Sequence, residues 1–444
     1  MAHRGTRVSL APREHWGSRL GFVMAAIGSA VGLGNMWRFS YLTAANGGAA
    51  FVLLYLSMTL FVGVPIMLAE FTLGRGAGKS PVLALAHYGG TRWRPLGWLF
   101  VASGFLILAY YSVIAGWTMR YTLHGLLAGF GGDAAARFDA FATGGDAVAW
   151  HAAFMAITIV VVAGGVKGGI ERTNLILMPL LFLIVLGLAV YASTLPGATA
   201  GYAYYLQPDF SEILSLSVLT SAAGQAFFSL SLGMGAMLTY ASYLDREHHL
   251  PSEAIQVALS DFMVAFVAGL VVFPVLFALG LQSAVGESTI GALFITLPSA
   301  FAGMGVAGRL VGILFFSALF VGALTSAISL LEVVVANAMD GFGWTRRRAA
   351  VVFGIATGVL GVPAALDLAA LGFMDELAGY VFLVVGALAL SIFVGWVMDD
   401  PEAEVRVGAP GTGWLGAWRA VLRFVTPPLL VVVLAYSLRS LLAG

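Results

Sequence analysis

Long apolar stretches without Asp, Glu, Lys or Arg make up most of the chain and alternate with short charged segments. A helix needs about 20 mostly apolar residues to cross the hydrocarbon core of a membrane. The segment 288–308 is the weakest candidate for such a helix, because Gly and Pro interrupt it and it is only moderately apolar. The candidate stretches are residues 20–37, 39–69, 95–119, 147–166, 173–208, 213–244, 262–286, 288–308, 310–331, 349–366, 377–398 and 424–438.

The placement of Lys and Arg indicates how these stretches cross the membrane, because short cytoplasmic loops collect basic residues. With the N-terminus inside and 288–308 as an external re-entrant element, 17 of the 22 basic residues fall on the cytoplasmic side. If 288–308 were a span, the Arg triplet at 346–348 would face outside. We therefore predict an all-α integral membrane protein with eleven transmembrane helices, a cytoplasmic N-terminus and an external C-terminus. The exceptions are Arg137, Arg309 and Arg439, which are expected outside, and Arg38 and Arg120, which are expected within helices.

The composition agrees with this prediction and excludes several classes of protein. Hydrophobic residues make up 60% of the chain and charged residues only 10%, compared with about 25% charged residues in soluble domains. A soluble enzyme, a disordered chain and a nucleic-acid-binding protein are therefore excluded. Since the chain contains no Cys, a disulfide framework, a thiol nucleophile and a cysteine-ligated metal are excluded as well.

Two of the predicted helices have unusual interiors. The first contains GSAVGLGN at residues 28–35, and the sixth contains SLSLGMGA at residues 229–236. Glycine permits non-helical backbone, and free backbone N–H and C=O groups are tolerated inside a bilayer only where they line a cavity within the protein. These interruptions therefore predict a polar site near the middle of the membrane, although small residues also allow close packing of helices.

The two broken helices occupy corresponding positions, first and sixth, which is typical of two inverted five-helix repeats with a binding site at the midplane. We predict a single transporter domain over residues 1–444, with repeats at 19–193 and 213–397 and an eleventh helix at 418–442. N-terminal ends of half-helices attract an anion, whereas C-terminal ends and unwound carbonyls bind a cation. From these features alone, the chain is expected to be a cation-coupled transporter.

Several longer motifs identify a family. The runs EHWGSRLGFVMAAIGSAVGLGNMWRF, NGGAAF and PIMLAEFTLGR are similar to the N-terminal third of neurotransmitter:sodium symporters, in particular bacterial amino-acid transporters. The segments GQAFFSLSLGMGAMLTYASY and GALTSAISLLE resemble the sixth and eighth helices of the same family. The resemblance extends from about residue 13 to the end of the chain. It implies a sodium-coupled symporter that works by alternating access, and not an enzyme.

The resemblance implies two sodium sites built from oxygen ligands, which hard cations prefer. The first site would also include the carboxylate of the substrate, so that each ligand raises the affinity for the other. Asp261 stands where Asn is more familiar in the family, and an ionisable residue at membrane depth is a functional residue by default. The implied ligands are Ala30, Asn35, Ser229 and Asp261 at the first site, and Gly28, Val31, Gly322, Thr325 and Ser326 at the second.

The expected substrate class depends on Gly32. Family members that carry monoamines have an Asp at this position, so the Gly implies a substrate that brings its own carboxylate. The side chain of the substrate would face a mostly apolar wall that contains an adaptable Met. We therefore expect a neutral hydrophobic amino acid: leucine, methionine or an aromatic one. The implied substrate-binding residues are Ala30, Leu33, Gly34, Ile107, Tyr111, Phe228, Ser229, Ser231, Met234 and Leu330.

Alternating access needs gates whose charges pair in one state and separate in another. The resemblance implies an outer pair, Arg38 with Asp375, and an inner pair, Arg13 with Asp340, although the inner two can also be ordinary charges at helix ends. Trp16 and Tyr243 would lie beside the inner pair, so the expected gate residues are Arg38, Asp375, Arg13, Asp340, Trp16 and Tyr243.

Chloride is expected not to be required. Members of the family that do not need chloride supply a carboxylate near the first sodium site, often at the position of Ala265. Asp261 lies one helical turn away and can take over that role.

Two other functions are left open by the sequence. A sensor of amino acids would keep the same binding site with little flux, and a transporter of another small zwitterion, such as a betaine, would keep the mechanism. The expected partners are sodium ions, a small neutral amino acid and membrane lipid, without nucleic acid. Compact loops favour the inner (cytoplasmic) membrane of a bacterium, and the oligomeric state is left open.

Overall fold

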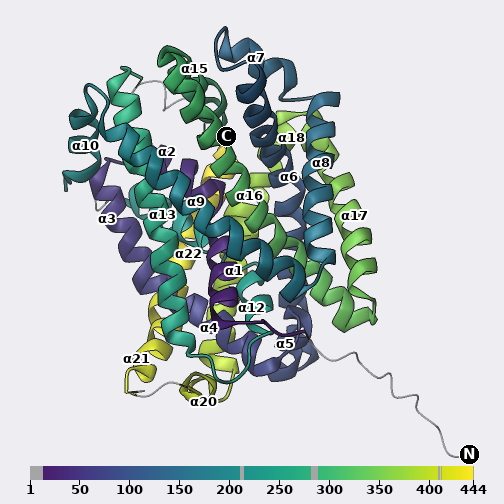
Figure 1. Cartoon of the computed structure of the whole chain (residues 1–444). Coiled ribbons are helices and arrows are strands. Elements are labelled where there is room, and N and C mark those ends of the chain that lie inside the picture. The colour runs from purple at the N-terminus through teal and green to yellow at the C-terminus, as the bar shows by residue number, and fades with distance from the viewer. Residues whose placement is uncertain (1–13, 211–214, 282–288, 409–410, 412, 444) are drawn as a thin grey trace, which may run out of the picture.

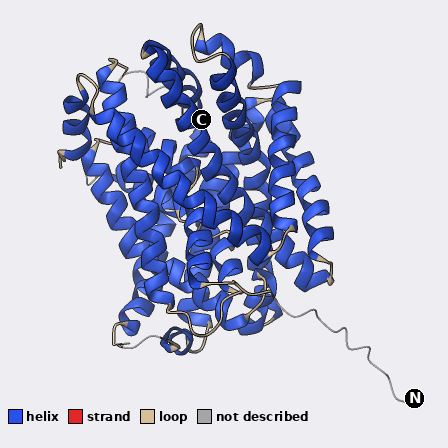
Figure 2. Cartoon of the chain, viewed as in Figure 1, coloured by secondary structure: helices blue, strands red, loops and turns tan. Residues whose placement is uncertain are grey.

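Nine helices are long and apolar enough to cross a membrane in this computed structural model, which describes residues 14–210, 215–281, 289–408, 411 and 413–443. Every regular element within those residues is a helix, so the expected all-α class is confirmed (Figures 1 and 2). The spanning elements are α3 (Ala49–Met58) with α4 (Val64–Ala77), α6 (Arg94–Leu127), α8 (Gly145–Ala163), α9 (Arg172–Ser193), α13 (Leu250–Ala278), α16 (Gly305–Phe342), α17 (Arg346–Leu366), α18 (Leu368–Glu376) with α19 (Leu383–Ile392), and α21 (Leu415–Ala420) with α22 (Thr426–Ala443).

A tenth span is broken near its middle. It consists of α1 (Arg19–Ala30) and a second helix that includes the π-helical turn η1 (Gly34–Arg38) and α2 (Phe39–Ala45). The two parts meet at an angle of 62°, and residues 31–33 connect them. The break therefore lies in the Gly-rich segment where the sequence predicts it.

A second break separates α11 (Leu216–Ser229) from α12 (Ala236–Ala241). Each part is too short to cross a membrane alone, since a span needs about 20 residues. The predicted number of eleven helices treats this pair as the sixth span. That number and the inverted repeats stay predictions, and the first residues of the expected second repeat, 213–214, lie outside the described residues.

The segment 288–308, which was expected to be re-entrant, contains no helix long enough to span a membrane in its described part. Short helical pieces, which are α14 (Thr289–Gly291), η6 (Ala292–Thr296) and α15 (Leu297–Gly303), precede α16. α15 lies at the same end of the bundle as α7 (Ala134–Phe141) and α10 (Ala198–Leu206) (Figure 1). At the opposite end lie α5 (Pro81–Gly89) and α20 (Pro401–Arg406) (Figure 1).

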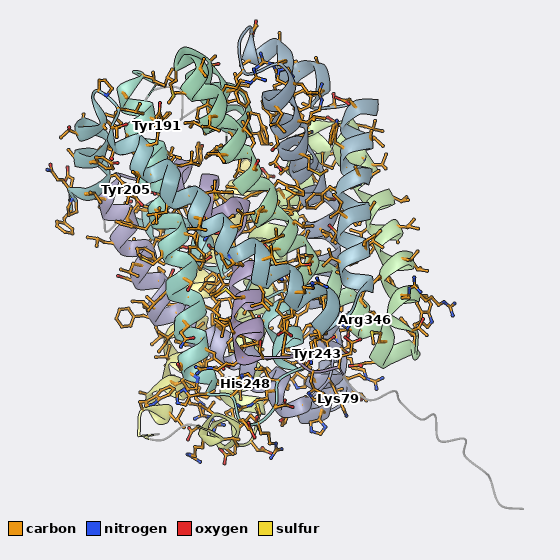
Figure 3. All side chains as sticks on the ribbon, in the orientation of Figure 1. Lys79, Tyr191, Tyr205, Tyr243, His248 and Arg346 are labelled. Carbon is orange, nitrogen blue, oxygen red and sulfur yellow. The ribbon has the colours of Figure 1, made fainter. Side chains whose placement is uncertain are left out.

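Lys79 and Arg346 lie at the end of the bundle that contains α5 (Figure 3). Both are among the residues expected to be cytoplasmic, and their common location agrees with that expectation. The sidedness of the membrane itself stays a prediction.

The most deeply buried spans are α6 and α16, which lie in the centre of the bundle and pack against each other. The outer helices instead expose rows of apolar side chains, such as Leu183 and Leu186 on α9 and Val359 on α17. Such faces suit contact with lipid, where apolar side chains lose nothing by exposure. The central helices are therefore the ones expected to form the polar site near the middle of the membrane.

Candidate substrate and sodium site

The break in α1 releases backbone carbonyls from their helical hydrogen bonds. The N–H of Gly32 donates to Oδ1 of Asn35 at 2.9 Å, instead of to the carbonyl of Gly28 four residues earlier. The N–H of Leu33 is bound to the hydroxyl of Tyr111 at 3.2 Å, instead of to the carbonyl of Ser29. Because buried backbone oxygens need partners, the released carbonyls are available to side chains or to a cation.

The second break is held open by its own set of hydrogen bonds. Ser231 has a φ of 54°, and Gly233 has a φ of 78°, a left-handed conformation that suits Gly. The hydroxyl of Ser231 donates to the carbonyl of Ser29 at 2.8 Å, which links the two breaks directly. The buried carboxylate of Glu70 accepts from the N–H groups of Gly233 and Leu238 at 2.9 and 3.0 Å. Glu70 therefore stabilises the irregular segment and the start of α12 by accepting one hydrogen bond from each.

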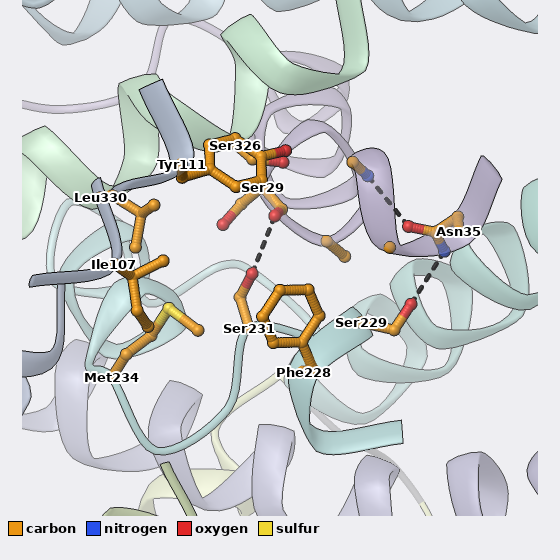
Figure 4. A pocket seen from close by; sticks show the side chains of 13 residues that line it. Ser29, Asn35, Ile107, Tyr111, Phe228, Ser229, Ser231, Met234, Ser326 and Leu330 are labelled. Carbon is orange, nitrogen blue, oxygen red and sulfur yellow. Dashed lines mark hydrogen bonds between the residues drawn. The ribbon is translucent and has the colours of Figure 1, made fainter. Parts of the chain in front are cut away.

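A pocket lies between the two breaks (Figure 4). One side is polar and includes the backbone at the α1 break, whereas Ile107, Met234 and Leu330 form an apolar side. All of the expected substrate-binding residues except Leu33 line the pocket, and Leu33 reaches it through the contact with Tyr111. The complete lining is Ser29, Ala30, Gly32, Gly34, Asn35, Ile107, Tyr111, Phe228, Ser229, Ser231, Met234, Ser326 and Leu330.

Three of the four expected ligands of the first sodium site form one buried cluster. The Nδ2 group of Asn35 donates to Ser229 Oγ at 2.8 Å and to Asp261 Oδ1 at 2.6 Å. Ser229 in turn donates to Asp261 Oδ2 at 2.8 Å. Ala30, the fourth expected ligand, lines the adjoining pocket. The C-terminal ends of α1 and α11 also lie here, and the partial negative charge of a helix C-terminus favours a cation.

The expected ligands of the second sodium site also come together. The hydroxyl oxygen of Ser326 lies 3.4 Å from the carbonyl of Gly28, 3.2 Å from that of Val31 and 3.1 Å from that of Gly322. Thr325 Oγ1 lies 3.0 Å from the same Gly322 oxygen. One hydroxyl hydrogen serves only one acceptor well, so this crowding of oxygens suits a bound cation better than a set of ordinary hydrogen bonds.

Arg38, one of the two expected outer gate residues, lies next to the pocket. The guanidinium carbon of Arg38 is 4.6 Å from the centre of the Phe228 ring, which lines the pocket. Arg38 and Asp375 both lie within electrostatic range of the Tyr110 hydroxyl. Their expected pairing as an outer gate stays a prediction.

The expected inner gate is only partly covered by the described residues, because Arg13 lies outside them. The carboxylate of Asp340 accepts from the backbone N–H of Ser80 at 2.7 Å. Trp16 packs edge-to-face against Tyr243, with ring centres 6.4 Å apart, and its indole N–H donates to the carbonyl of Tyr240 at 2.9 Å. Trp16 and Tyr243 are therefore in contact with each other, and their role in an inner gate stays a prediction.

Two groups at these sites escaped the reasoning from sequence. Tyr55 donates to Asp261 Oδ2 at 3.0 Å, and the sequence showed it only as a Tyr within an apolar run.

The second group lies beneath the pocket. Arg346 forms two parallel contacts of 2.6 and 2.9 Å with buried Glu332, which also accepts from the Tyr243 hydroxyl at 2.5 Å. Bidentate pairs of this kind are strong and directional, so Glu332 on α16 holds the first turn of α17 in place.

Comparison with known proteins places this geometry in context. The family model described as the sodium:neurotransmitter symporter family matches residues 13–130 and 139–443. The chain is similar to an uncharacterized sodium-dependent transporter of Methanocaldococcus jannaschii, with 34% identity over 97% of this chain and 91% of the relative. It is also similar to the uncharacterized sodium-dependent transporter YhdH of Bacillus subtilis, with 35% identity over 94% of this chain and 96% of the relative.

A solved structure extends the similarity to three dimensions. The crystal structure of MhsT in complex with L-phenylalanine is similar with a TM-score of 0.87 and 42% sequence identity. The similarity covers 96% of this chain and 100% of that chain. It therefore includes the helices that form the pocket.

Proposed function

We propose that this chain, which belongs to the sodium:neurotransmitter symporter family, is a sodium-coupled symporter of neutral hydrophobic amino acids that works by alternating access. The family consists of integral membrane transporters and not of enzymes, and the chain has several membrane spans. The observation that carries the proposal is the pocket between the two helix breaks, which lies beside two clusters of buried oxygen atoms.

The polar side of the pocket suits the α-carboxylate and amine of an amino acid. The Leu33 amide and the Tyr111 hydroxyl are already in contact and offer donors to a carboxylate. Gly32 leaves room for that group, because a Cβ at this position would lie 2.8 Å from the Tyr111 hydroxyl and 2.7 Å from Ser326 Oγ. The carbonyl of Ala30 and the C-terminal end of α11 favour the amine.

The apolar side of the pocket suits a hydrophobic side chain. Ile107, Met234 and Leu330 offer no charge to pair with an acidic or basic substrate. Burying an unpaired charge among them would be costly. The bound L-phenylalanine of MhsT, a relative with 42% identity, supports an aromatic or large aliphatic substrate.

The two oxygen clusters account for coupling. In the proposed first site, Asn35, Ser229 and Asp261 share a sodium ion with the substrate carboxylate, so each raises the affinity for the other. In the proposed second site, the ion joins the broken end of α1 to α16. Asp261 supplies a negative charge beside the first ion, and we propose that chloride is not required for that reason.

The decisive experiment measures binding of radiolabelled phenylalanine to the purified protein in sodium and in potassium. We expect saturable binding in sodium only, with competition by leucine, methionine and tryptophan but not by glutamate or lysine. Flux into proteoliposomes with an imposed sodium gradient then tests transport. Binding that is equal in potassium would refute the sodium sites.

The same experiment separates the two alternatives. Sodium-dependent binding without flux above protein-free liposomes would indicate a sensor. Competition by glycine betaine, together with weak competition by leucine, would indicate a transporter of a different zwitterion and would refute the interpretation of the apolar wall.

A further inference from the structure

A second cavity, of about 150 Å³, lies away from the central pocket, at the end of the bundle that contains α7. It lies where the last turns of α6 meet α7 and the start of α8. None of the expected substrate, sodium or gate residues lines it. The lining residues are Arg120, Tyr121, His124, Arg137, Ala140, Phe141 and Asp146.

Basic side chains dominate this cavity. Two guanidinium groups and one imidazole face it, against the single carboxylate of Asp146. Arg120 uses its Nε group to contact Asp146 Oδ2 at 3.2 Å, and both side chains are partly exposed, at 32% and 43%. Among the described residues, the terminal nitrogens of Arg120 and the ring of His124 have no hydrogen-bond partner in the protein. Several charged or polar donors are therefore available to an occupant.

The remaining groups hold the cavity in shape. Arg137 donates to the backbone carbonyls of Phe130 and Gly131, which fixes its guanidinium at the start of α7. The Phe141 ring lies 5.7 Å from the guanidinium carbon of Arg120, a distance at which cation and ring attract each other. The donors are thus positioned by contacts within the protein, and not only by the flexibility of long side chains.

The sequence makes this cluster unusual. Most basic residues are predicted to be cytoplasmic, yet Arg120 and Arg137 meet at the opposite end of the bundle from Lys79. Arg309 lies nearby, but it donates to the carbonyls of Gly125 and Leu126 at the end of α6 and does not line the cavity. A helix C-terminus attracts such cations, which explains Arg309 but not the free donors of Arg120.

We propose that this cavity binds an oxyanion, a phosphate or carboxylate group, between Arg120, His124 and Arg137. The planar guanidinium fork matches two oxygens of such a group, and charge-assisted hydrogen bonds of this kind are strong. The oxyanion has two possible sources, a soluble anion or the head group of an anionic lipid. Leu123 and Leu127, which are 39% and 75% exposed on the same turns of α6, bring the cavity next to an apolar surface.

The test compares two variants of the Arg120–Asp146 ion pair. One removes its positive charge and the other removes its negative charge, so their effects on anion binding should be opposite. Inorganic phosphate is titrated against the thermal midpoint of the purified full-length protein, with chloride at matched ionic strength as the reference. Arg120→Gln and Asp146→Asn each remove one charge of the ion pair between these two side chains. Arg309→Gln is the matched control, because it removes an arginine at the same end that does not line the cavity.

We expect phosphate to raise the midpoint of the unmodified protein. Its half-effect concentration should rise about tenfold in Arg120→Gln, which loses charge-assisted hydrogen bonds. It should fall about threefold in Asp146→Asn, which loses a competing negative charge. Arg309→Gln should leave it unchanged. Sodium-dependent phenylalanine binding, retained in all three variants, shows that they are folded.

A second arm identifies the source of the oxyanion. The protein is placed in nanodiscs of phosphatidylcholine with and without phosphatidylglycerol, and retained lipid is counted by native mass spectrometry. Retention of phosphatidylglycerol that Arg120→Gln abolishes assigns the site to a lipid head group, whereas an effect of phosphate alone assigns it to a soluble anion. The proposal is overturned if phosphate does not change the thermal midpoint and no phosphatidylglycerol is retained. It is also overturned if Arg120→Gln and Asp146→Asn shift the half-effect concentration of phosphate in the same direction.

Discussion

Replacement of Ser326 by Ala tests the proposed second sodium site. The Ser326 hydroxyl lies within 3.1–3.4 Å of three carbonyl oxygens, from Gly28, Val31 and Gly322. Without sodium, this hydroxyl can donate to one of the three at a time. With sodium, its oxygen would become one of five ligands. The substitution therefore affects both states, and the two effects must be weighed against each other.

The magnitude follows from these two effects. A hydrogen bond to a charged group contributes about 1.5–3 kcal/mol, and we assign the same range to a hydroxyl oxygen on a cation. The sodium-free state loses one ordinary hydrogen bond, which offsets about 1 kcal/mol of that loss. Since about 1.4 kcal/mol corresponds to a factor of ten, the half-saturating sodium concentration should rise about tenfold.

The assay is a sodium titration of radiolabelled phenylalanine binding, with potassium replacing sodium at constant ionic strength. Ser329→Ala is the matched control, because Ser329 is buried on the same helix and also bonds to α1, by accepting from the Ser29 hydroxyl at 2.7 Å, without contacting the three clustered carbonyls. An equal shift in the two variants, or no shift in Ser326→Ala, would show that the crowded oxygens are ordinary packing and not an ion site.

Three further predictions concern the central pocket. Asp261→Asn keeps the shape of the first site but removes its charge, so the half-saturating sodium concentration should rise at least about tenfold. Sodium titrations in chloride and in gluconate should then show that chloride restores part of the affinity. Gly32→Ala should reduce phenylalanine binding by about tenfold or more, since its Cβ would lie 2.8 Å from the Tyr111 hydroxyl; Gly224→Ala, whose Cβ meets nothing within 4 Å, should bind normally. Glu70→Ala should lower the thermal midpoint and abolish binding, because two buried N–H groups lose their acceptor at about 1–3 kcal/mol each; an unchanged midpoint would contradict the role assigned to Glu70.

The helix breaks could be predicted from sequence because their signals are local, whereas the second oxygen cluster was implied by the family resemblance. Gly beside Asn or Ser in an otherwise apolar run indicates non-helical backbone, and this signal can be recognised from a few neighbouring residues. The Thr-Ser pair at 325–326 gained its meaning from the family motif around it. The break at 31–33 and the clustering of Ser326 with Val31 agree with those predictions.

Contacts between distant parts of the chain were out of reach of the same reasoning. Tyr55 meets Asp261 across 206 positions of sequence, and nothing in its apolar run distinguishes it from a lipid-facing Tyr. Glu332 and Arg346 are 14 positions apart, yet their pairing depends on how α16 and α17 turn toward each other. Such pairs are set by packing, which a pattern along one helix does not specify.

The Ser326 hydroxyl lies close to carbonyls of both α1 and α16, and this has a consequence for the stability of the protein. A cation at the proposed second site would fasten the broken end of α1 to α16, so it would act as a removable crosslink inside the bundle. A ligand at a hundred times its dissociation constant stabilises the folded state by about 2.7 kcal/mol. Resistance to unfolding would then depend on the salt in which the protein is stored, and exchange of sodium for potassium during purification would loosen α1 before any substrate is added.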